Sequence, residues 1–141
     1  MQRITRHVFW LEGVVVSPGT VYQIQPGMAK VLDALHHRFE LWLVSNYPPQ
    51  QVATIISENS LSQWFEDGSV YSLPDYIVDH HAMLQSLVEA DVIVPGNSLW
   101  IDPHPIRTML AIRQGIDATV FVDSERLYRD LGLWGIVSLD K

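Results

Sequence analysis

Strand-like and helix-like segments alternate along most of this chain, and that alternation limits the folds open to it. Short runs rich in β-branched and aromatic residues take turns with segments whose apolar residues recur every three or four positions. This order predicts an α/β protein whose connecting helices cover both faces of a mainly parallel sheet. We therefore expect a three-layer, Rossmann-like sandwich with ligands at the carboxyl ends of the strands.

Turn and capping residues mark where these segments end. Pro48 and Pro49 supply the fixed φ angle that suits the first turn of a helix. Gly115 follows a helical pattern at a position that favours glycine, and Ser124 can cap the next helix. We predict helices over residues 28–37, 50–58, 105–113 and 124–131, a short helical turn over 61–65, and a longer helix from Pro74-Asp75 through Val88. We predict strands over residues 7–16, 39–45, 68–73, 97–102, 118–123 and 135–139, the last at an edge of the sheet.

Size and composition exclude several classes of protein. The 141 residues suit one domain, and a content of 48% hydrophobic and 18% charged residues is enough to bury a core. The net charge of −7 repels the phosphates of nucleic acids and anionic lipids. No apolar run approaches the roughly 20 residues that span a bilayer. We therefore expect a single soluble domain over residues 1–141 that binds neither nucleic acid nor membrane.

Cysteine is absent, which excludes disulfides, thiolate metal sites and cysteine nucleophiles. The first residues lead directly into a strand-like run without a signal-peptide core. A cytoplasmic location follows as the expectation, because a chain without disulfides suits a reducing compartment.

Four short motifs occur in order on the predicted elements. They are FWLEGVV at residues 9–15, LVSN at 43–46, LPD at 73–75, and LWIDPHP at 99–105 followed by a helix that ends RQGI at 113–116. Together they resemble the motifs of the haloacid dehalogenase-like (HAD) hydrolase superfamily. The resemblance implies a HAD-like core, and the short spacing between the motifs implies a capless member.

The resemblance also implies a role for each motif residue. Members of the family use a carboxylate nucleophile that attacks phosphorus, a second carboxylate two residues later as general acid/base, and a hydroxyl that binds the phosphoryl group. In this sequence Trp10 stands at the nucleophile position and Glu12 at the acid/base position. Ser45 stands at the position of the phosphate-binding hydroxyl, with Asn46 beside it. An indole cannot form an acyl phosphate, so we expect no covalent phosphoryl transfer.

The remaining positions of the resemblance are also changed. Leu73 stands where the family has a lysine, so no ammonium faces the phosphoryl oxygens. The family's fourth motif contains two acidic residues, and Asp102 can be aligned with it in two ways. If Asp102 matches the first acid of an adjacent Asp-Asp pair, Pro103 replaces the second. If Asp102 matches the principal metal ligand, Ile106 replaces the acid expected four residues later. Mg²⁺ asks for several carboxylate or other oxygen ligands, so we expect no tight magnesium binding and no cofactor.

A weaker metal site remains open at the carboxyl edge of the sheet. Glu12, Asp102 and His104 can converge there, and carboxylates with an imidazole suit several transition metals. By contrast, Asp79-His80-His81 lies inside a predicted helix, where consecutive side chains point about 100° apart. We interpret that motif as a solvated helix face.

These observations favour a catalytically inactive protein with a HAD-like hydrolase fold. It acts as a binding or interaction module, and its 5 Trp, 5 Tyr and 4 Phe are candidate anchors for a protein partner or for self-association.

Two alternatives stay open. One is a phosphoric ester hydrolase with a displaced site, in which another metal activates a water beside Glu12, Ser45, Asp102 or His104. The other is a small-molecule pocket protein with an apolar cleft lined by Trp10, Tyr47 and Trp100.

Overall fold

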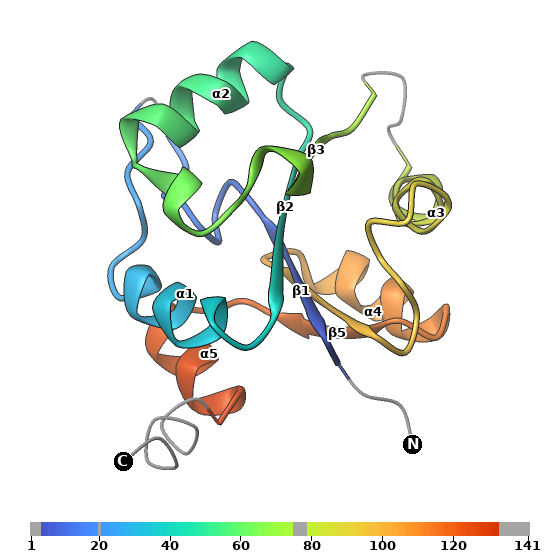
Figure 1. The fold of residues 1–141 in the computed structure, drawn as a ribbon. Coiled ribbons are helices and arrows are strands. Elements are labelled where there is room, and N and C mark those ends of the chain that lie inside the picture. The colour runs from blue at the N-terminus through green and yellow to red at the C-terminus, as the bar shows by residue number, and fades with distance from the viewer. Residues whose placement is uncertain (1–3, 20, 75–78, 133–141) are drawn as a thin grey trace.

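All five strands of the described chain join one parallel sheet in the order β3-β2-β1-β4-β5 (Figure 1). The structure is a computed structural model that describes residues 4–19, 21–74 and 79–132. The strands are β1 (Arg6–Trp10), β2 (Glu40–Ser45), β3 (Val70–Ser72), β4 (Ser98–Asp102) and β5 (Asp117–Val120).

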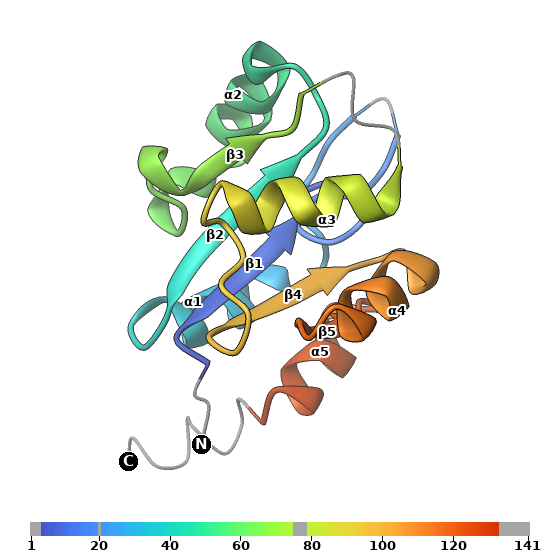
Figure 2. The ribbon, with the colours of Figure 1, turned by 90° about the vertical axis from the view of Figure 1, so that its right-hand side faces the viewer.

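Helices cover both faces of this sheet, as the alternating pattern predicts (Figures 1 and 2). One face carries α1 (Met28–His36), α2 (Pro49–Glu58) and α5 (Ser124–Asp130), and the other carries α3 (His80–Glu89) and α4 (Pro105–Arg113). Two short 3₁₀ turns, η1 (Leu61–Gln63) and η2 (Asp67–Ser69), connect α2 to β3. The three-layer α/β class predicted from the sequence is confirmed.

The first strand is shorter than predicted, because the chain turns sharply after Trp10. The backbone N–H groups of Val15 and Val16 both donate to the carbonyl of Leu11, at 3.0 and 3.1 Å, and Gly13 adopts a φ of 85°. That left-handed conformation suits glycine and ends the extended run. A β-propensity pattern cannot see the turn, because Val14, Val15 and Val16 are as β-branched as the strand before them.

Two helix starts also differ from the predictions. The N-cap of α5 is Asp123, whose carboxylate accepts the N–H of Arg126 at 2.8 Å, while Ser124 is the first helical residue. In the described chain, α3 begins at His80, and residues 75–78, where its predicted start lies, are outside the described residues. The predicted edge strand over residues 135–139 also lies outside the described residues.

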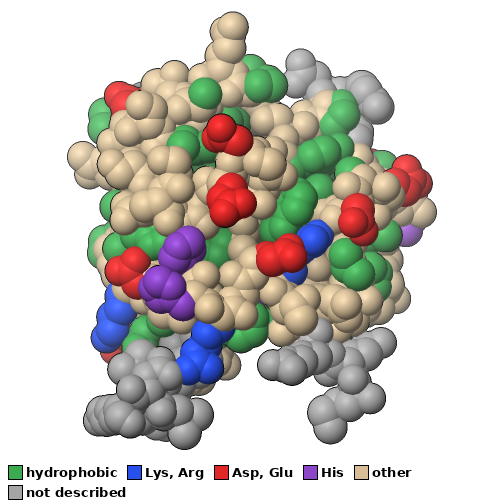
Figure 3. All heavy atoms as spheres, in the orientation of Figure 1, with side chains coloured by type: hydrophobic (Ala, Val, Ile, Leu, Met, Phe, Trp, Pro, Cys, Tyr) green, Lys and Arg blue, Asp and Glu red, His purple; other side chains and the backbone are tan. Residues whose placement is uncertain are grey.

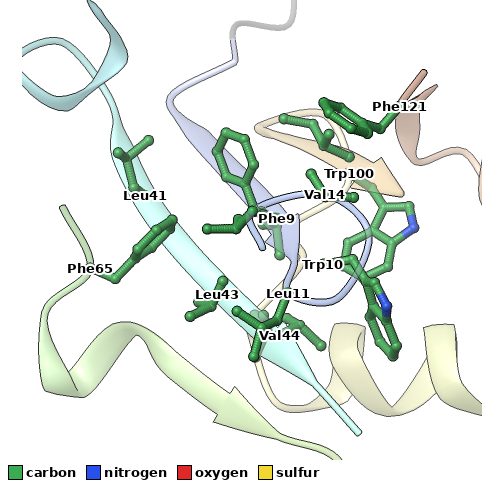
Figure 4. Close-up of a cluster of buried hydrophobic side chains, with 14 of the residues drawn as sticks. Phe9, Trp10, Leu11, Val14, Leu41, Leu43, Val44, Phe65, Trp100 and Phe121 are labelled. Carbon is green, nitrogen blue, oxygen red and sulfur yellow. The ribbon is translucent and has the colours of Figure 1, made fainter. Parts of the chain in front are cut away.

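Large aromatic residues fill the core on both faces of the sheet. Phe9 packs edge-to-face on Phe65 on one side of β1, with ring centroids 6.0 Å apart. On the other side Trp10 packs on Trp100, with ring centroids 6.2 Å apart (Figure 4). None of the helices in the described part of the chain is both long enough and apolar enough to cross a bilayer.

One buried polar residue makes the stability of this core depend on pH. His7, on β1, is 4% exposed, and its Nδ1 atom has no hydrogen-bond partner. Burial lowers the pKa of His7 from 6.5 to about 4, because the charged imidazolium is poorly solvated there. Between about pH 6.5 and pH 4 the unfolded chain therefore binds a proton at His7 that the folded chain does not bind. The free energy of unfolding consequently decreases as the pH is lowered.

We expect the free energy of unfolding to fall by about 2–3 kcal/mol between pH 7 and pH 4.5 through His7 alone. Urea denaturation of wild type and of His7→Leu at both pH values measures this effect, and the variant should lack that part of the loss. His37→Leu, at an exposed histidine, is the matched control and should keep the wild-type pH dependence. Equal pH dependence in wild type and His7→Leu would contradict the assignment.

Candidate functional site

Three of the predicted site residues end three neighbouring strands. Trp10 is the last residue of β1, Ser45 of β2 and Asp102 of β4, and all three strands run parallel. The register pairs Phe9 with Ile101 and Trp10 with Val44, so these strand ends lie side by side at one edge. This edge is where ligands bind in open α/β sheets.

The residues at the end of β2 hold the turn that follows it. Ser45 is buried, and its Oγ accepts the N–H of Tyr47 at 3.0 Å while its carbonyl accepts the N–H of Leu73 at 2.8 Å. Asn46 is exposed at the same turn. Tyr47, predicted to share a cleft with Trp10 and Trp100, contacts Tyr22 instead, with ring centroids 5.7 Å apart.

Glu12 lies in the turn after β1, partly exposed. It forms no hydrogen bond or ion pair with any other described residue. The next residue, Gly13, packs on the loop after β4, because a Cβ atom there would lie 3.5 Å from Cγ of Pro103. The turn that carries Glu12 therefore packs against the loop that follows Asp102.

Asp102 is the most heavily bonded side chain at this edge. It is fully buried, and its carboxylate accepts four hydrogen bonds: from Nε1 of Trp100 at 2.7 Å, from the backbone N–H of His104 at 2.9 Å, and from Nε and Nη2 of Arg107 at 2.5 and 2.7 Å. A carboxylate offers about four lone-pair sites. All of them are used inside the protein.

The guanidinium of Arg107 lies between this carboxylate and an aromatic ring. Its Cζ atom is 4.2 Å from the centroid of the Trp10 ring, and Nη1 lies 3.9 Å from Sδ of Met83. Trp10 is 6% exposed and Arg107 7%. We call Trp10, Trp100, Asp102 and Arg107 the Trp10 cluster: a charge-neutral, buried group that joins β1, β4 and α4.

Two histidines lie beside the Trp10 cluster. His104 is the N-cap of α4, and its Nδ1 accepts the N–H of Arg107 at 3.4 Å. The ring of His80 packs on His104, with centroids 4.5 Å apart. The pKa of His80 is lowered, first by burial and then by the neighbouring His104 and Arg107 charges. Asp79, the N-cap of α3, and His81 are exposed, as a solvated helix face requires, whereas His80 is partly buried by its contact with His104.

Arg107 is the residue that the sequence interpretation missed. It lies in the first turn of α4, five residues after Asp102, which ends β4. An aspartate at a strand end followed by arginine in the first turn of the next helix is a detectable signal, because the long arginine side chain can reach back to the strand. In residues 4–19, 21–74 and 79–132, no three His, Asp or Glu side chains are placed to share a metal ion.

The Trp10 cluster predicts a large stability effect for either charged partner. Arg107→Met leaves the Asp102 carboxylate buried without its cation, so we expect a loss of about 3–5 kcal/mol in the free energy of unfolding. Asp102→Asn combined with Arg107→Met should recover part of that loss, because the uncompensated charge is gone. Denaturant unfolding of the single and double variants measures both values.

The exposed pair Arg126 and Asp130 provides the matched control. Its N–O distance is 3.6 Å, and about half of each side chain is exposed. Arg126→Met should cost no more than about 0.5 kcal/mol, as is usual for exposed helix pairs. Similar losses in Arg107→Met and Arg126→Met would show that the buried ion pair does not have the role assigned here.

Solved structures with the same fold are found despite low sequence identity. A hydrolase from Streptococcus pneumoniae matches with a TM-score of 0.68 at 13% identity, covering 92% of this chain and 98% of that one. L-2-haloacid dehalogenase from Xanthobacter autotrophicus matches with a TM-score of 0.70 at 14% identity, covering 91% and 82%. A HAD-family enzyme from Bacteroides thetaiotaomicron, in complex with magnesium and inorganic phosphate, matches with a TM-score of 0.56 at 17% identity, covering 72% and 54%.

The chain thus spans little more than half of the Bacteroides enzyme and nearly all of the Streptococcus hydrolase. No protein-family model matches the sequence, and no curated protein matches it. The likeness therefore shows the fold. The chain has the fold of the HAD-like hydrolase superfamily, as its motifs predict.

Proposed function

We propose that this chain is a catalytically silent HAD-like protein that works as a binding module. The observation that carries the proposal is the Trp10 cluster, which fills the end of β1 with an indole ring and a guanidinium. A HAD-like hydrolase needs a carboxylate oxygen at this strand end to attack phosphorus. Trp10 supplies no such oxygen, and its ring contacts Arg107 and Trp100 instead of facing a substrate.

Magnesium, which the fold family implies, does not fit the residues of this edge. Mg²⁺ requires near-octahedral oxygen ligands, usually with carboxylates among them. Trp10 and Pro103 have no side-chain oxygen, and both oxygens of Asp102 already accept two hydrogen bonds each. Glu12 would be left as a single carboxylate.

The placement of Asp102 favours one register of the fourth motif. Asp102 belongs to β4, with its carboxylate inside the Trp10 cluster, whereas Pro103 is the residue that meets Gly13 at the sheet edge. This supports matching Asp102 to the first acid of the family's pair and Pro103 to the second. In this alignment Pro103 replaces the family's second acid, which is the one that would face a metal ion.

Exposed apolar side chains support the binding half of the proposal. Ile106, Met109 and Ile112 on α4 are 44–56% exposed, and Val122 after β5 is 58% exposed. Such side chains at a surface are available for contact with a protein partner or a second copy. Of the Trp, Tyr and Phe residues that the structure describes, six are buried in the core and six are partly buried, so only the latter remain candidate anchors.

A phosphatase assay tests the catalytic half. Wild type with Mg²⁺ and p-nitrophenyl phosphate should show no turnover above that of a Glu12→Ala variant purified in the same way. Repeating the assay with Mn²⁺ and Zn²⁺ covers a displaced metal site. Metal-dependent turnover that disappears in Glu12→Ala or Asp102→Ala, with the variants shown to be folded, would overturn the proposal and favour the hydrolase alternative.

A further inference from the structure

The opposite end of the sheet has a hollow that the strand pattern explains. β3 pairs only with residues 43–45 of β2, so residues 40–42 have no neighbouring strand on that side (Figure 2). A hollow of about 500 Å³ lies at this open edge, a size that suits a side chain or a small ligand. It is at the amino end of β2, away from the strand ends that form the Trp10 cluster.

Aromatic side chains line this hollow on both faces of the open sheet edge. Phe39, Trp42 and Trp64 line it. Trp64 is held in place by a 2.7 Å hydrogen bond from Nε1 to Asp33, and Phe39 packs on the ring of His7 with centroids 4.5 Å apart. These two rings are therefore fixed by other contacts, which lowers the entropy cost of binding against them.

Trp42, on the face of β2 that carries Glu40, already contacts a cation of the chain itself. The guanidinium of Arg6 lies 4.5 Å from the centroid of the Trp42 ring, and its Nε bonds to Glu40 at 2.9 Å. The pKa of Glu40 is lowered by hydrogen bonds from Trp42 and Arg6, so the carboxylate stays ionised. Arg6 is further engaged by the carbonyl of Asp91 at 2.6 Å. This arrangement shows that an indole and a carboxylate of the hollow can hold a guanidinium.

A second carboxylate at the hollow has no such partner. Glu66 lines the hollow and is exposed, and its carboxylate forms no ion pair or hydrogen bond with another described residue. Arg6 is committed to Glu40, and the other basic residue lining the hollow, His36, is an exposed histidine. The hollow therefore keeps a negative charge in a chain of net charge −7, and acidic side chains are spread over the face that Figure 3 shows.

We infer that this hollow receives a lysine or arginine side chain of a basic peptide segment in a protein partner. The incoming cation pairs with Glu66 and packs against the rings of Phe39 and Trp64, while Arg6 keeps its contact with Trp42. This inference rests on the proposed binding role and adds to it the surface and the chemistry of the partner. The competing explanation is that the acids only protect an open sheet edge against wrong pairing.

Titration of the full chain with the peptide acetyl-Arg₄-amide tests the inference. The indole N–H signals of Trp42 and Trp64, assigned from Trp42→Phe and Trp64→Phe, should shift in a saturable manner in NMR spectra. Glu66→Gln should weaken the apparent affinity about fivefold, as expected for one partly exposed ion pair. An uncharged peptide, acetyl-Gln₄-amide, should cause no such shifts.

Glu125→Gln, at an exposed glutamate in the first turn of α5, is the matched control, because it removes the same charge elsewhere. It should bind like wild type. Absent shifts at both indoles, or equal weakening by Glu66→Gln and Glu125→Gln, would overturn the inference and leave only attraction to the net charge. Either failure would leave the phosphatase result, and hence the catalytically silent assignment, unaffected.

Discussion

The buried ion pair between Asp102 and Arg107 is the interaction on which the arrangement of the carboxyl edge depends. It joins the end of β4 to the first turn of α4 by two parallel N–H to oxygen bonds, a geometry that fixes orientation as well as distance. Trp100 and the His104 backbone fill the remaining lone pairs of the carboxylate. Because the pair is out of water, it stabilises the fold only while every charge and lone pair is matched.

The fold could be predicted from the sequence, because strand and helix periodicities are local properties. The predicted strands over 39–45 and 97–102 lie within one residue of β2 and β4, and helix α4 has its predicted bounds. Trp10 could be placed at a strand end only through the motif resemblance, because the local pattern extends the strand over residues 7–16. Its partners could not, because the contact with Arg107 joins residues 97 positions apart and depends on how α4 packs on the sheet.

His80 is a second residue whose contacts could not be predicted from the local sequence. Its sequence neighbours Asp79 and His81 are both exposed, and nothing local predicts that the ring between them packs on His104. Likewise, the hollow beside Glu66 exists because β3 is only three residues long, and strand length is among the least local features of a sheet. A shared fold, for this reason, leaves the chemistry of each strand end to be argued residue by residue.

The position of Arg107 over the Trp10 ring also bears on what a single substitution at Trp10 could achieve. A mutation of Trp10 to aspartate would place a new carboxylate beside a guanidinium that is already poised to bind it. The new acid would be neutralised as an internal salt bridge rather than left free to attack a substrate. A free carboxylate at this strand end would therefore need a change at Arg107 as well as at Trp10.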